Sequence, residues 1–232
     1  MTTPQKNIIN AAAWNNFSHD AKNPMMAIYT LLELLSLDNV DFQAPKVKNN
    51  IEICKSQLTK LKFVVGNFAD IQRLDTLFIN KQEEDIIRLL DLVKGEYLAR
   101  LKMEQHKFKV SKGKIKFVVD ANIFKQMISN MIEHFMLFSE KGSISQFYCS
   151  LESQNKLIIQ LQYHGAGLLT SSELEEIFLI ESAIVDKKKG IKYNKGLGLT
   201  YNKIMAQYLG GDFQLLIDEA NLSHTLQLKL LE

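Results

Sequence analysis

The sequence predicts an α + α/β protein, in which an antiparallel helical hairpin forms a dimeric four-helix bundle and is followed by an α/β sandwich. Three observations support this class. Apolar residues recur at alternating spacings of three and four early in the chain, strand-like stretches alternate with helical ones later, and turn residues separate these stretches. We therefore expect two domains, a helical one at residues 1-80 and a sandwich at residues 81-232.

The first predicted helix spans about residues 6–37 and carries one continuous apolar seam. The seam consists of Trp14, Phe17, Ala21, Pro24, Ile28, Leu31 and Leu35. A break follows at residues 38–41, and Pro45 suits the first turn of a second helix. The second helix repeats the pattern at Ile51, Cys54, Leu58, Leu61, Val65 and Phe68. Two such helices joined by a short loop are typical of an antiparallel hairpin.

Further apolar residues lie off both seams, and a single hairpin cannot cover all of them. They are Met25, Leu32, Leu34, Phe63 and Val64. Each such side chain gains roughly 1.5–3 kcal/mol on full burial, so we expect a homodimer whose two hairpins form the four-helix bundle. Methionines make adaptable contacts, and Met25 and Met26 either pack in this core or stay exposed as a docking surface.

The second half of the chain predicts helices laid against one mixed sheet. The charged residues 82–85 are expected to be a linker or a helix start, and a helix follows at residues 86–103. Strands at 107–110 and 114–119 are expected to form a hairpin, and Asp120 is expected to cap a helix at 122–138. The remaining expected elements are strands at 144–151 and 157–163, a lysine-rich loop at 165–195, a helix at 197–209 that ends at Gly210 and Gly211, and strands at 213–217 and 225–230.

Composition is that of an ordinary globular protein, with 46% hydrophobic and 23% charged residues and a net charge of +2. The lysines are spread along the chain, which argues against a nucleic-acid partner. No apolar run is long enough to span a membrane and no signal peptide is visible, so we expect a cytoplasmic protein without a membrane partner. Cys54 and Cys149 lack metal-ligand spacing, and no metal site is expected.

His19 is the candidate for chemistry in the first helix. It follows the seam residue Phe17 by two positions and therefore faces away from the seam, and Asn23 shares its face. A free imidazole with a pKa near ~6.5 is mostly neutral and nucleophilic at pH 7, and a neighbouring carboxylate such as Asp20 can accept its proton. An exposed histidine is also commonly an ordinary surface residue, so both interpretations stay open.

Residues 17–24, Phe-Ser-His-Asp-Ala-Lys-Asn-Pro, resemble the H-box of two-component histidine kinases. The resemblance implies that His19 is the phosphoacceptor and that Asp20 assists proton transfer. In that family Asn23 is the position that orients water when such proteins dephosphorylate a partner. The resemblance also implies receiver domains of response regulators as partners.

Residues 78–231 resemble the ATP-binding domain of histidine kinases, which is shared with gyrase-type ATPases. The resemblance implies an α/β sandwich of histidine-kinase ATPase type, with Phe178 in the lid region. It places a vestigial cofactor site at Asn130, Gly165, Gly167, Gly196 and Gly198. Glycines at a helix start can bind an anion, but they also persist where the backbone needs positive φ, and we favour this second reason.

Three departures from the family pattern concern the nucleotide. His134 replaces the asparagine that holds magnesium, Leu137 replaces a basic residue near the phosphates, and Tyr163 replaces the aspartate that binds the adenine amino group. Imidazole is a poor magnesium ligand, and phosphoryl transfer from ATP depends on positioning and charge neutralisation. We therefore expect no cofactor, with ATP and Mg bound only if the protein is an active autokinase.

Three functions follow from these resemblances. The first is a histidine phosphotransferase that carries phosphoryl on His19 and exchanges it with the aspartate of receiver domains. The second is a sensor-type histidine autokinase that uses ATP. The third is a non-catalytic scaffold, or a phosphatase, that binds a response regulator. The departures at the nucleotide positions favour the first over the autokinase. Asp20 and Asn23 argue against a pure scaffold, because bundle packing does not need them at exposed positions, but a phosphatase would use them too, so that alternative stays open.

Overall fold

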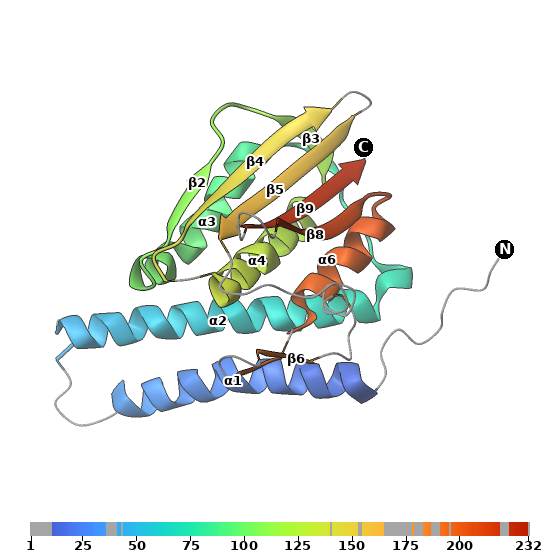
Figure 1. The fold of residues 1–232 in the computed structure, drawn as a ribbon. Helices are drawn as coiled ribbons and strands as arrows, with labels where there is room; N and C mark the ends of the chain where they lie inside the picture. The colour runs from blue at the N-terminus through green and yellow to red at the C-terminus, as the bar shows by residue number, and fades with distance from the viewer. Residues whose placement is uncertain are drawn as a thin grey trace.

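The chain builds four layers, with a sheet on one side and the helix α1 (Ala11–Leu35) on the other (Figure 1). Helix α2 (Pro45–Gln72) runs antiparallel beside α1. Three helices cover the sheet face that is turned toward α2: α3 (Ile86–Met103), α4 (Ala121–Phe138) and α6 (Gly196–Tyr208). A short 3-10 helix, η1 (Leu74–Thr76), follows α2. The helix α2 therefore lies between α1 and most of the α/β part, and α6 also contacts α1.

The computed structural model describes residues 11–35, 41–42, 44–139, 141–152, 155–164, 178, 183–186, 191–194, 196–218 and 223–231. The side chain of His19 lies outside the described part, as do the side chains of residues 183–186, 191–194 and 196. Gly165, Gly167 and most of the predicted lid region also lie outside it. Among the described residues, no helix combines the length and the apolar content needed to cross a membrane.

The main sheet has five strands in the order β2-β4-β5-β9-β8. These strands are β2 (Lys107–Val110), β4 (Ile144–Glu152), β5 (Lys156–His164), β9 (Ser223–Leu231) and β8 (Asp212–Asp218). The pair β2 and β4 is parallel and all other neighbours are antiparallel, so the sheet is mixed as predicted. Two smaller pairs are antiparallel, β1 (Gln82–Asp85) with β3 (Lys116–Val119) and β6 (Ala183–Asp186) with β7 (Ile191–Asn194).

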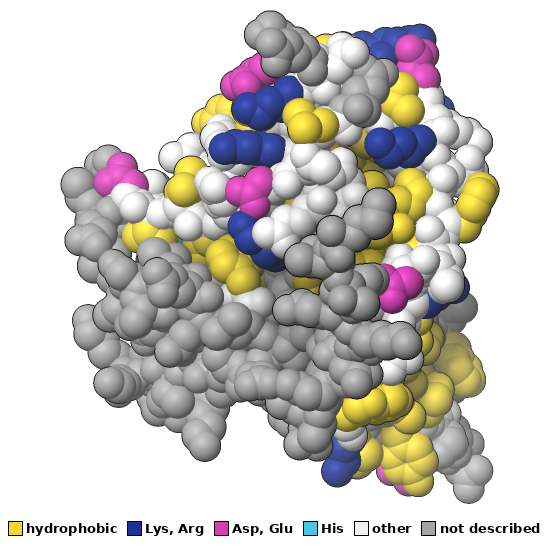
Figure 2. All heavy atoms as spheres, turned by 90° about the vertical axis from the view of Figure 1, so that its right-hand side faces the viewer, with side chains coloured by type: hydrophobic (Ala, Val, Ile, Leu, Met, Phe, Trp, Pro, Cys, Tyr) yellow, Lys and Arg dark blue, Asp and Glu magenta, His cyan; other side chains and the backbone are white. Residues whose placement is uncertain are grey.

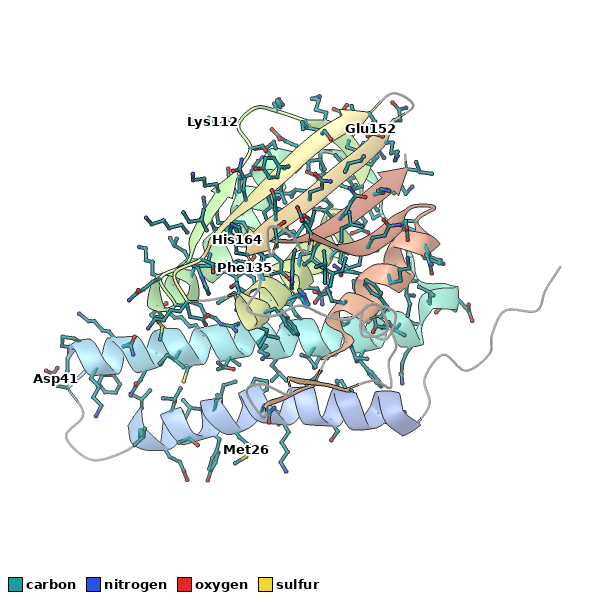
Figure 3. The ribbon with its side chains drawn as sticks, in the orientation of Figure 1. Met26, Asp41, Lys112, Phe135, Glu152 and His164 are labelled. Carbon is teal, nitrogen blue, oxygen red and sulfur yellow. The ribbon has the colours of Figure 1, made fainter. Side chains whose placement is uncertain are left out.

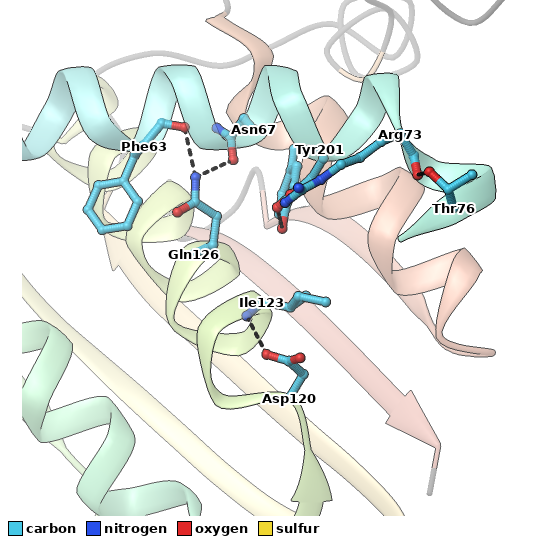
Figure 4. Close-up of polar contacts among 9 residues, drawn as sticks. Phe63, Asn67, Arg73, Thr76, Asp120, Ile123, Gln126 and Tyr201 are labelled. Atoms are coloured by element: carbon cyan, nitrogen blue, oxygen red, sulfur yellow. Dashed lines mark hydrogen bonds and ion pairs between the residues drawn. The ribbon is translucent and has the colours of Figure 1, made fainter. Parts of the chain in front are cut away.

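The predicted helices are confirmed where the structure describes them; residues 6–10 and 36–37 of the first predicted helix lie outside the described part. The starts of α2, α3 and α4 follow from ordinary capping chemistry. Pro45 opens α2, where its missing N–H is not needed. The Asp85 side chain accepts a hydrogen bond from the Arg88 N–H at the start of α3. Asp120 does the same for the N–H groups of Asn122 and Ile123 in α4, as Figure 4 shows for Ile123.

Three predictions about strands are wrong. The charged stretch Gln82–Asp85 is the strand β1, because it pairs residue by residue with β3. The strands β2 and β3 do not form a hairpin, since β2 pairs with β4 and β3 with β1. The expected loop at 165–195 contains the strands β6 and β7. In each case the partner is set by contacts that local sequence does not encode.

The hairpin seam is confirmed along α1 except at Trp14, which is 51% exposed, and only in part along α2. Phe17 stacks on Phe68 with ring centroids 4.2 Å apart, which fixes α1 against α2. Leu58 and Val65 were predicted to lie in the seam, yet both are exposed in this chain. Phe63, expected to need a second copy, is buried against Tyr97 of α3. The reason is that α2 has to cover two neighbours, α1 on one side and the α/β part on the other.

Candidate functional site

The H-box segment lies in α1, and the helix continues through Pro24. His19 belongs to α1 by its backbone, while its side chain lies outside the described residues. Asp20 is half-buried and Asn23 is exposed. Phe17 is held by the stack on Phe68 and lies two residues before His19. The structure thus fixes the helical frame that carries His19.

Asn130, predicted to be a vestigial cofactor ligand, lies in a buried cluster of side-chain amides. Its amide exchanges two hydrogen bonds with Asn67 of α2, of 2.9 and 3.1 Å, and its Nδ2 also donates to Oδ1 of Asn202 at 3.0 Å. Gln126 donates from Nε2 to Oδ1 of Asn67 and to the Phe63 carbonyl, both at 2.7 Å (Figure 4). We call Asn67, Gln126, Asn130 and Asn202 the amide cluster.

Of the four glycines in the predicted cofactor site, the structure describes Gly196 and Gly198, which lie at the start of α6. Gly196 is the first residue of α6, whereas Gly165 and Gly167 lie outside the described residues. Gly198 does not have the positive φ that we favoured as its reason. A Cβ at Gly198 would lie 3.1 Å from Oδ1 of Asn130, so this glycine leaves room for the amide cluster.

His134 and Tyr163 lie together in an aromatic cluster between α4 and β5. Both are almost fully buried, and their ring centroids are 6.2 Å apart. Tyr163 also packs on Phe135 at 5.5 Å and on His224 at 5.3 Å, and Figure 3 shows Phe135 under the sheet near the end of β5. Burial raises the pKa of Tyr163, so the phenol stays neutral. The rings fill the space that their elements enclose.

Burial, with a smaller contribution from the nearby His224, lowers the pKa of His134 from its usual value to about 3. The unfolded chain takes up this proton near pH ~6.5, but the folded chain takes it up only near pH 3. Between these values the unfolded state binds more protons, so the free energy of unfolding falls as the pH falls. We expect a loss of ~1.4 kcal/mol per pH unit below about pH 6 from this residue.

Urea unfolding at pH 7, 6 and 5 tests this expectation. The His134→Phe variant should lose less stability on acidification than the wild type, because one buried titrating group is gone. Phe135→Leu is the control: it disturbs the same aromatic cluster without removing a proton site, and should keep the wild-type pH slope. Equal slopes for His134→Phe and the wild type would contradict the prediction.

The resemblance to the ATP-binding domain assigns several described residues to a nucleotide site. These residues do not fit magnesium and ATP. The imidazole of His134 is buried among rings, and its Nε2 has no hydrogen-bond partner in the described part of the chain. Tyr163 places a buried ring where the family has a carboxylate, and Leu137 is exposed where the family has a cation. The side-chain oxygen of Asn130, the atom that could bind a metal, accepts a hydrogen bond from Asn67, and its Nδ2 donates to Asn67 and Asn202 within the amide cluster.

Sequence analysis did not identify the other members of the amide cluster: Asn67 and Asn202, which bond to Asn130, and Gln126, which bonds to Asn67. Asn67 is a polar residue among the apolar residues of the second helix, and it is only 3% exposed. A polar residue in such a stretch was the available signal, because buried amides are normally hydrogen-bonded. The sequence could not name the partners, since the hydrogen bonds that join them connect residues 59 to 72 positions apart along the chain.

Comparisons with known proteins give a match in structure only. No family model matches the chain, and no curated protein matches it. The Acinetobacter baumannii histidine kinase AdeS superposes with a TM-score of 0.61 and 16% identity, over 91% of this chain and 96% of that chain. The mycobacterial sensor histidine kinase MprB gives a TM-score of 0.54 and 15% identity, over 64% and 97%.

A third solved structure contains a partner. The histidine kinase ThkA in complex with the response regulator protein TrrA gives a TM-score of 0.59 and 15% identity, over 92% of this chain and 59% of that chain. Two of these three matches extend over the helices α1 and α2 as well as the α/β part, because they cover more than nine tenths of the chain. The chain therefore has the fold of solved histidine kinases.

Proposed function

We propose that this protein is a histidine phosphotransferase of two-component signalling, with His19 as phosphoacceptor. The observation that carries the proposal is a contrast within one chain. The H-box resemblance covers nearly every position of that box and lies on α1, while His134 and Tyr163 are buried in an aromatic cluster where the histidine-kinase fold would bind nucleotide. Chemistry at His19 therefore needs a phosphoryl donor other than ATP.

The proposed donor is an aspartyl phosphate on a receiver domain. An imidazole nitrogen of His19 attacks the phosphorus, the bond between phosphorus and the aspartate oxygen breaks, and aspartate leaves as a carboxylate. Asp20 accepts the proton from the imidazole. The reverse reaction passes the phosphoryl group to a second receiver, and each receiver supplies its own magnesium. The complex of ThkA with a response regulator supports this class of partner.

The proposed functional unit is a homodimer formed by residues 1-80, with residues 81-232 as a supporting domain. Large apolar side chains on α1 and α2 are exposed in the single chain: Met25, Met26, Tyr29, Leu32, Leu34, Leu58 and Val65. Figure 3 shows Met26 on the side of α1 that faces away from α2, and Figure 2 shows hydrophobic side chains at the lower edge, where the hairpin lies. A four-helix bundle would cover part of this surface, and receiver docking would use the part beside His19.

Sedimentation velocity tests the dimer. The wild type should sediment as a dimer at micromolar concentration, and Leu32→Glu combined with Leu58→Glu should give a folded monomer, because charges would enter an apolar interface. Replacing Lys46 and Asn49, exposed residues of α2 that lie away from Leu58 around the helix, by glutamate is the control and should leave the dimer intact. A monomeric wild type would contradict this part of the proposal.

Radiolabel transfer tests the function. The protein is incubated with aspartate-phosphorylated receiver domains of its own organism, and in parallel with labelled ATP and magnesium. We expect acid-labile, alkali-stable label on the protein from a receiver and none from ATP. Label from ATP would instead indicate an autokinase, and no label from either source, with receiver binding retained, would indicate a scaffold.

A further inference from the structure

The amide cluster joins two parts of the molecule that are distant in sequence. Asn67 comes from α2, Gln126 and Asn130 from α4, and Asn202 from α6. Asn67, Asn130 and Asn202 are all nearly inaccessible to solvent. Figure 4 shows Asn67 and Gln126 meeting between α2 and α4. The cluster therefore lies inside the contact between the hairpin and the α/β part.

The orientation of every amide in the cluster is determined at its two ends by backbone carbonyls. Gln126 donates from Nε2 to the Phe63 carbonyl, so it presents the same nitrogen to Oδ1 of Asn67. Asn202 donates from Nδ2 to the Met127 carbonyl at 2.9 Å, so its Oδ1 faces Asn130. A carbonyl only accepts, and a reversed amide would place oxygen against oxygen. The hydrogen bonds thus fit in a single arrangement.

Contacts on both sides of the cluster extend the same interface along α2. Phe63 stacks on Tyr97 of α3 at 6.4 Å, and Tyr201 of α6 donates from its hydroxyl to Asp70 at 3.2 Å. A Cβ at Gly66 would lie 3.2 Å from Nε2 of Gln126, so this glycine allows the close approach of α4. One face of α2 is therefore shaped and hydrogen-bonded to fit the α/β part.

We propose that the amide cluster fixes the α/β part on α2 in one position, so that the hairpin and the α/β part move as one rigid body. Satisfied buried hydrogen bonds are directional, and separating the two parts would leave several buried donors and acceptors without partners. The amide of Asn130 thus has a structural role between domains. This inference concerns the resting protein and does not depend on phosphoryl transfer.

Two isosteric substitutions distinguish the effect of losing the amide hydrogen bonds from the general cost of burying a charge. Asn130→Asp replaces both donated hydrogen bonds by contacts between oxygens, one with Asn67 and one with Asn202. Asn67→Asp keeps both accepted hydrogen bonds and loses only the one that it donates to Asn130. Both variants bury one carboxylate in the same interface. Asn49→Asp, at an exposed position near the start of α2, is the surface control.

The distance between two nitroxide labels measures the position of the two parts. The labels are placed at Lys48→Cys on α2 and Ser150→Cys on β4, after Cys54 and Cys149 are replaced by alanine. Labelled protein is diluted with unlabelled protein, so that only pairs within one chain are counted. Double electron–electron resonance should give one narrow distance distribution for the otherwise unchanged protein and for Asn49→Asp.

Asn130→Asp should broaden the distribution and lower the melting temperature by roughly 5–10 °C, and Asn67→Asp should have about half that effect. Gln126→Leu covers the case in which Asn130→Asp does not fold. Gln126 is only half-buried, so this variant should fold and still broaden the distribution. A distribution that stays narrow in Gln126→Leu, or an effect of Asn67→Asp equal to that of Asn130→Asp, would overturn the proposal.

Discussion

Replacing His19 by alanine is expected to abolish phosphoryl transfer from a phosphorylated receiver domain. The proposed reaction has one nucleophile, the imidazole, and alanine offers none, so we expect a loss of at least roughly a thousandfold in the rate of labelling. The measurement is the radiolabel assay with the wild type and His19→Ala at equal receiver concentration. Binding of the receiver should be retained, because the substitution removes a single side chain from a long helix.

His164→Ala is the matched control for this experiment. His164 is an exposed histidine at the end of β5 (Figure 3), and its removal should leave labelling unchanged. Asp20→Asn should slow labelling by roughly 10²–10⁴-fold, as expected for loss of a proton acceptor. Label on His19→Ala at the wild-type rate would assign the nucleophile to another residue and would remove the basis of the proposed function.

The helices could be predicted from sequence because their signals are local. Apolar spacing and a cap residue lie within one or two turns of each helix end, and for this reason α3 was predicted with the ends that it has. The C-terminal glycines of α6 belong to the same class of signal, since Gly210 has a φ of +81°. Such features need no knowledge of the rest of the fold.

Strand partners and the roles of buried polar residues could not be predicted, because both depend on distant contacts. Gln82–Asp85 has the composition of a solvent-exposed linker, and only its pairing with β3 makes it a strand. In the same way, the sequence places Asn130 in the predicted cofactor site but does not show which residues surround it. Its structural role follows from Asn67 and Asn202, which the fold brings beside it.

Gly211→Ala is expected to destabilise the protein by about 3 kcal/mol or more. A Cβ at Gly211 would lie 2.0 Å from the backbone oxygen of Lys229 and 2.9 Å from its carbonyl carbon. Lys229 belongs to β9, which is hydrogen-bonded on both sides by β5 and β8, so it cannot move away without disturbing the sheet. For a chain of this size the melting temperature should fall by roughly 6–12 °C.

Substitutions at two other glycines distinguish two causes of destabilisation: lack of space for a Cβ and an unfavourable backbone conformation. A Cβ at Gly95 or at Gly210 meets no atom within 4 Å, but only Gly210 has a positive φ. Gly95→Ala lies in the exposed part of α3 and should stabilise by about 0.5–1 kcal/mol, whereas Gly210→Ala should destabilise by ~1 kcal/mol. If Gly211→Ala instead melts within about 2 °C of Gly210→Ala, the close approach of the connection between α6 and β8 to β9 is wrong. The packing of α6 that positions Asn202 for the amide cluster would then also be in question.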